Sequence, residues 1–73
     1  MFLFVRGPLG QCITIDVEEE DTILTVKHKI HAKYAAQPEN QRLSFDGDTL
    51  EDERTLGDYG IKREATIFMG VRP

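Results

Sequence analysis

Residues 42–61, RLSFDGDTLEDERTLGDYGI, form the stretch from which the rest of the chain is best interpreted. Single apolar residues are spaced among polar ones, and acidic residues are unusually dense. Carboxylates at such density occur in calcium-binding loops, in pairs of catalytic acids and in surface turns. Their spacing decides among these possibilities. The acids are Asp46, Asp48, Glu51, Asp52, Glu53 and Asp58.

The acidic stretch does not fit a calcium-binding loop or a catalytic pair. An EF-hand loop needs oxygen ligands at set positions and a glycine at the sixth. Counted from Asp46, the fifth position is Leu50 and the sixth is Glu51, so the template fails. A catalytic pair needs two carboxylates across a cleft, and 73 residues leave little room for one. We interpret FDGD as a turn between short strands, with Asp52 and Asp58 capping or bracing loops.

The segments on either side of this stretch have the alternating pattern of β-strands. Residues 1–7 and 12–17 alternate apolar with polar or aromatic residues, and GPLG at 7–10 has turn chemistry. Together they predict a hairpin. Residues 64–71, EATIFMGV, alternate again, and residues 43–45 form a short strand.

Between the hairpin and the acidic stretch lies the pattern of an amphipathic helix. Asp21 or Thr22 caps its N-terminus, and Pro38 cannot continue it. Strand, strand, helix, short strands and strand predict an α+β fold in which one helix packs on a mixed sheet. The helix face that we expect to be buried consists of Ile23, Val26, Ile30 and Tyr34.

Composition limits the function classes. Hydrophobic residues make up 40% of the chain, as in a globular domain. The net charge of -4 argues against nucleic acid and acidic membranes as partners. No apolar run approaches the length of a membrane span. Cys12 is the single cysteine and cannot form an internal disulfide. We therefore expect a reducing compartment, the cytoplasm or the nucleus.

Three residues are candidates for catalysis or metal binding. Cys12 would need an activating base, and its strand phase places it on an outer face. His28 and His31 share a helix face, but zinc needs at least one further ligand. We therefore predict a non-enzyme with no metal and no cofactor. Phe2, Phe4 and Phe68 also point outward on their strands, and either partner contact or packing at the chain end explains them.

The chain resembles the ubiquitin family over its whole length. QRL, LED, RTL and DY in the acidic stretch match that family, as do IT..VE and DTI..VK.KI in the earlier segments. The resemblance implies a β-grasp fold with residues 1–73 as one domain, and a pair between Lys27 and Asp52 close to the core. Alanines at 35 and 36 replace a glycine and an isoleucine, so we expect a shifted helix cap there. The predicted core is Leu3, Val5, Ile13, Ile15, Val17, Ile23, Val26, Ile30, Leu43, Leu50, Leu56, Ile61, Ile67 and Met69.

The C-terminal tail departs from the family. Ubiquitin is joined to lysines through a flexible tail that ends in Gly-Gly, whereas this chain ends MGVRP. We expect a non-catalytic, monomeric protein-interaction domain. Since Met1 opens the first strand, we expect it to be the N-terminal module of a larger protein that it links to the ubiquitin and proteasome system. The alternatives are a modifier or precursor whose Gly-Gly tail is missing from this chain, and a free-standing binder.

The apolar patch that ubiquitin receptors contact is also changed. A serine at 44 replaces its central aliphatic side chain, and a glycine at 70 replaces another. Burying an aliphatic side chain contributes roughly 1.5–3 kcal/mol, so receptor binding should weaken at least about tenfold. We expect altered protein partners, or a face that has drifted and binds none. The partner-binding residues that the resemblance implies are Pro8, Arg42, Ser44, Gly47, Phe68, Gly70 and Arg72.

Overall fold

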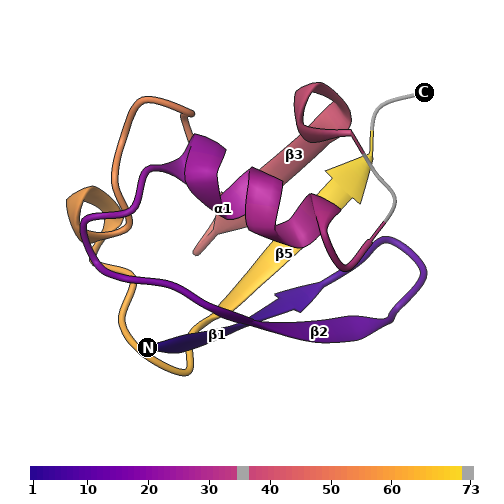
Figure 1. Cartoon of the computed structure of the whole chain (residues 1–73), viewed down its shortest axis with the longest axis horizontal. Helices are drawn as coiled ribbons and strands as arrows, with labels where there is room; N and C mark the ends of the chain where they lie inside the picture. The colour runs from indigo at the N-terminus through magenta and orange to yellow at the C-terminus, as the bar shows by residue number, and fades with distance from the viewer. Residues whose placement is uncertain (35–36, 72–73) are drawn as a thin grey trace.

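The computed structural model describes residues 1–34 and 37–71. The expected cap at Ala35 and Ala36, and the site residue Arg72, lie outside the described residues. Figure 1 shows α1 crossing one face of a curved sheet. The elements, in order, are β1 (Phe2–Arg6), β2 (Cys12–Asp16), α1 (Ile23–His31), η1 (Pro38–Asn40), β3 (Gln41–Phe45), β4 (Asp48–Thr49), η2 (Gly57–Tyr59) and β5 (Thr66–Val71).

The sheet is mixed and has the strand order β2-β1-β5-β3-β4. β1 and β5 are parallel neighbours at its centre, and the other three pairings are antiparallel. A single helix packs on one face of this sheet, which is the β-grasp arrangement. The predicted α+β fold is therefore confirmed.

The core lies between α1 and the sheet. Thirteen of the predicted core residues are buried and form one cluster. The prediction that Ile13 is buried in the core is wrong, because this side chain is only partly buried and packs against the core from its margin. Ile13 lies on β2, an edge strand of the sheet, so only β1 flanks it within the sheet.

The helix begins where the sequence predicts and ends earlier. Thr22 is the N-cap, and its Oγ1 accepts from the amide of Thr25 at 3.2 Å. The helix ends at His31 rather than continuing to Tyr34. The amides of Lys33 and Tyr34 both donate to the carbonyl of Ile30, at 2.9 and 2.7 Å. These bonds tighten the last turn, and they leave Tyr34 half-buried against the core.

The acidic stretch folds into turns. Asp46 and Gly47 have φ values of 54° and 85° and form the two-residue loop between β3 and β4. Positive φ at both central residues is typical of a type I′ hairpin turn, which Asp-Gly favours. Asp58 braces the next loop, since its Oδ2 accepts from the amide of Thr55 at 3.0 Å.

Candidate protein-interaction face

None of the described elements covers the sheet face opposite α1, and this face carries most of the predicted site. Cross-strand register places one outward residue from each of the five strands in a continuous row. Arg6 and Ser44 flank Phe68 at the centre of this row. The row runs across the sheet in the order Cys12, Arg6, Phe68, Ser44 and Thr49.

Phe68 is the largest apolar side chain of the row and is 52% exposed. It alternates along β5 with the buried residues Ile67 and Met69, so the backbone directs its ring away from the core. Ser44, directly opposite, is half-buried and adds a hydroxyl in place of apolar surface. The ring therefore stands in a polar setting, with the guanidinium-bearing Arg6 on its other side.

Arg42 and Gly70 form the neighbouring row, again as direct cross-strand partners. Arg42 is exposed. An added Cβ at Gly70 would meet nothing within 4 Å, so this position is open surface. The structure thus brings four of the predicted site residues together on β3 and β5.

Pro8 and Gly47 lie in turns at the margin of the face. Pro8 is exposed in the turn between β1 and β2, and Gly47 is exposed between β3 and β4. Figure 1 shows that these two turns are at opposite ends of the sheet. They border the rows around Phe68 and are not part of them.

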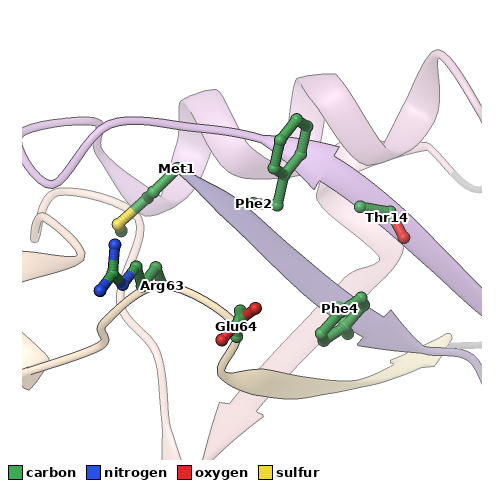
Figure 2. A pocket seen from close by; sticks show the side chains of 6 residues that line it. All are labelled: Met1, Phe2, Phe4, Thr14, Arg63 and Glu64. Carbon is green, nitrogen blue, oxygen red and sulfur yellow. The ribbon is translucent and has the colours of Figure 1, made fainter.

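A shallow hollow of about 530 Å³ lies beside these rows, toward the start of β1. Figure 2 shows the rings of Phe2 and Phe4 on β1, with Arg63 and Glu64 on the segment that leads into β5. Phe2 is 57% exposed, so packing at the chain end does not bury it. The hollow extends the apolar surface of the outer face. Its lining is Met1, Phe2, Phe4, Thr14, Arg63 and Glu64.

Lys27 and Asp52 form the ion pair that the resemblance implies. The Lys27 Nζ lies 2.7 Å from the Asp52 Oδ1. The lysine is buried, whereas the side chain of Asp52 is 46% exposed. Gln41 Nε2 donates to the carbonyl of Lys27 at 3.1 Å. These contacts join α1 to β3 and to the loop before η2, so they hold the fold and lie away from the outer face.

Two further carboxylates serve the loops. The amide of Glu18 donates to Asp21 at 2.9 Å, and this hydrogen bond lowers the pKa of Asp21. Burial raises this pKa, whereas the Lys29 ammonium, 3.1 Å from the carboxylate, lowers it further. The amide of Thr55 likewise lowers the pKa of Asp58. Low pKa values here follow from hydrogen bonds to the charged form. They indicate loop bracing and not acid chemistry.

Cys12 and the two histidines lie in different parts of the described structure. Cys12 is exposed and lies opposite Arg6, whereas the register pairs Phe2 with Asp16 and Phe4 with Thr14. His28 and His31 border a hollow of about 410 Å³ with Glu39. Within residues 1–34 and 37–71, no group of three or more His, Cys, Asp and Glu side chains could hold a metal ion. None of the described helices is long and apolar enough to cross a membrane.

Sequence reasoning missed Arg6 and Thr49 as members of the central row. Strand alternation places each of them on the outer face, but only the register between strands shows that they align with Phe68. It also missed the contacts of Lys29 and Lys33. Lys29 lies on α1 and Lys33 follows its end, and both side chains reach the backbone of β2.

Fold and site together define a β-grasp protein with an exposed, partly aromatic sheet face. The model of the ubiquitin family matches residues 3–73. The chain therefore belongs to the ubiquitin family.

Curated relatives align with the entire chain. Ubiquitin-like protein 4A of Esox lucius is 36% identical over 73 residues, which are 47% of its own length. Ubiquitin-like protein 4B of Homo sapiens is 34% identical over 42% of its length, and ubiquitin-like protein 4A of Mus musculus is 33% identical over 46%. The chain thus spans less than half the length of these relatives.

Proposed function

We propose that this chain is a non-catalytic interaction module that links a longer protein to the ubiquitin and proteasome system in the cytoplasm or nucleus. The observation that carries the proposal is the exposed Phe68 at the centre of an uncovered sheet face. Contiguous exposed apolar surface is typical of contact sites, and the exposed Phe2 adds to the apolar surface of Phe68 on the same face. Protein partners that present an apolar side chain to this ring are the ligands that the face fits.

The relatives support a module over a modifier. In the 4A and 4B proteins the matched region makes up less than half of the chain, so in them it is one part of a longer protein. The described residues also offer acids in bracing roles and an exposed cysteine with no histidine paired to it. This arrangement gives no support to an enzymatic role.

Partner choice should differ from that of ubiquitin. Ser44 removes apolar surface beside Phe68, and Gly70 offers no side chain at all. Central contacts of an interface typically cost ~2 kcal/mol or more when truncated. We therefore propose that the face selects partners through Phe68 with help from Arg42 and Arg6, where ubiquitin relies on aliphatic contacts.

The test is an NMR titration of the chain with a panel of proteasomal receptor domains and ubiquitin-binding helices. We expect backbone shifts to concentrate at Ser44, Phe68 and Gly70. Phe68→Ala should weaken binding at least about tenfold, since the ring is the main apolar contact. Leu24→Ala, an exposed apolar residue on α1, is the matched control and should leave affinity unchanged. No shifts at these three residues with any of the panel would refute the proposal.

A further inference from the structure

The free edge of β2 is set by the hydrogen bonds between β1 and β2. Val17 and Met1 exchange two backbone bonds, at 2.8 and 2.7 Å, and the amide of Gly7 donates to the carbonyl of Gln11 at 2.7 Å. In an antiparallel ladder, bonded and non-bonded pairs alternate. The backbone groups of Cys12, Thr14 and Asp16 therefore point away from β1, toward the open side of the sheet.

Lys29 on α1 and Lys33, two residues after its end, donate to two carbonyls on this edge. The Lys33 Nζ donates to the carbonyl of Thr14 at 2.6 Å, and the Lys29 Nζ donates to the carbonyl of Asp16 at 2.8 Å. Alternate carbonyls of a strand lie about 6.6–6.8 Å apart, and the tightened turn after His31 keeps Lys33 close enough to Lys29 for the two ammonium groups to reach both carbonyls. Both lysines therefore reach alternate carbonyls of the strand at the same time.

An exposed edge strand is a template for strand addition, and charged side chains are one way in which proteins prevent it. A strand that approached β2 would need to donate its amides to the carbonyls of Thr14 and Asp16. An ammonium group has donors and no acceptor, so it already fills the acceptor positions and offers nothing to an incoming amide. The edge is closed as long as Lys29 and Lys33 stay in place.

We propose that Lys29 and Lys33 close β2 to strand addition, and that the strand they exclude is β2 of a second copy of this chain. If two β2 strands pair antiparallel with Thr14 opposite Thr14 of the second copy, then Cys12 lies opposite Asp16 of that copy. The free backbone groups of Cys12, Thr14 and Asp16 then all take part in hydrogen bonds between the two strands. This register also sets Ile13 against Ile15 of the second copy. Ile13 is the core residue that the monomer leaves partly exposed, so pairing would cover it.

The test removes the two amines and keeps their aliphatic stems. Sedimentation velocity of Lys29→Met with Lys33→Met should show dimers at concentrations at which the unchanged chain is a monomer, with a dimer dissociation constant at least tenfold lower. Hydrogen exchange at the amides of Thr14 and Asp16 should slow at least tenfold in the double variant. Lys62→Met, at an exposed lysine in the turn before β5, is the matched control and should leave both readouts unchanged.

A third substitution tests whether β2 is the surface that pairs. Thr14→Pro removes a backbone amide that points away from β1, and edge strands tolerate proline at such a position. Added to the double variant, this substitution should return it to the mass of a monomer. Should the double variant fail to fold, Lys33→Met alone is used, because Lys29 pairs with Asp21 in addition to its bond to β2, whereas among the described residues the Lys33 Nζ donates to Thr14 alone. A folded variant that stays monomeric, even if less stable, overturns the proposal. So does a dimer that protects other amides or resists Thr14→Pro.

Discussion

Asp52 differs from the other acids of the stretch because it pairs with a buried lysine, Lys27, and so helps to stabilise the fold. Lys27 is 8% exposed and its Nζ lies 2.7 Å from the carboxylate. The acid is half-exposed, so water screens part of the attraction. The energy of the pair therefore comes mainly from avoiding an unpaired ammonium in the protein interior.

This asymmetry predicts the effect of removing the acid. Asp52→Asn should lower the free energy of unfolding by about 1–3 kcal/mol, because it leaves the buried ammonium of Lys27 without a charged partner. Urea denaturation at neutral pH measures the change. Glu53→Gln, at the exposed neighbouring acid, removes the same charge without that contact and should change stability by less than about 0.5 kcal/mol. Equal effects from both variants would contradict a specific role for the pair.

At the scale of elements, the turn between β3 and β4 depends on a backbone conformation that glycine favours. Gly47 has φ of 85°. Gly47→Ala should cost about 1 kcal/mol, since a Cβ is disfavoured at positive φ even where space is open. Thermal or urea unfolding checks this. Gly70→Ala is the control, because Gly70 has no positive φ and the added Cβ would meet no atom within 4 Å. A comparable loss of stability in Gly70→Ala would argue against the conformational cause.

Loop bracing makes stability depend on pH. Hydrogen bonds from the amides of Glu18 and Thr55 lower the pKa of Asp21 and Asp58, from a usual value of 3.8. A depressed pKa in the folded state means that the stabilisation is complete above the unfolded pKa and is lost as pH falls through the folded pKa. Unfolding free energy should therefore fall as the pH drops below about 4.

Substitution isolates this contribution to the pH dependence. Asp21→Asn with Asp58→Asn should lower stability at pH 7 and flatten the acid limb of its pH profile. Urea denaturation at several pH values from neutral to strongly acidic measures both effects. Glu20→Gln, an exposed acid in the loop before α1, should keep the original slope. An unchanged slope in the double variant would show that other carboxylates cause the acid sensitivity.

The strands and the helix start were predictable because they rest on local patterns. Alternation placed Leu3 and Val5 inward, and Thr22 capped the helix as expected. The helix end at His31 was not predictable, since tertiary packing decides where a last turn tightens. The row around Phe68 also needed the structure, because the alignment of β1, β3 and β5 joins residues that lie far apart in the sequence.

At the scale of the whole molecule, one sheet separates two kinds of surface. α1 and the core occupy one face, and none of the described elements crosses the outer face (Figure 1). The features that maintain the fold, such as Lys27 with Asp52, therefore lie apart from Phe68 and its neighbours. Substitutions on the outer face should change partner binding with little effect on stability.

This separation allows partner choice to be altered by design. Ser44→Ile with Gly70→Val adds aliphatic side chains on both rows beside Phe68, where the backbone leaves room at residue 70. Each newly buried aliphatic group contributes roughly 1.5–3 kcal/mol, so binding to ubiquitin receptor domains should tighten at least about tenfold. Calorimetric titration measures the affinity. Glu20→Ile, which adds an apolar residue in the loop between β2 and α1, should leave it unchanged. The double variant could instead gain no affinity while remaining as stable as the original chain. That result would show that Phe68 and the arginines exclude such receptors. The face would then be selective by shape and charge, and the loss of apolar area would not explain its weak binding.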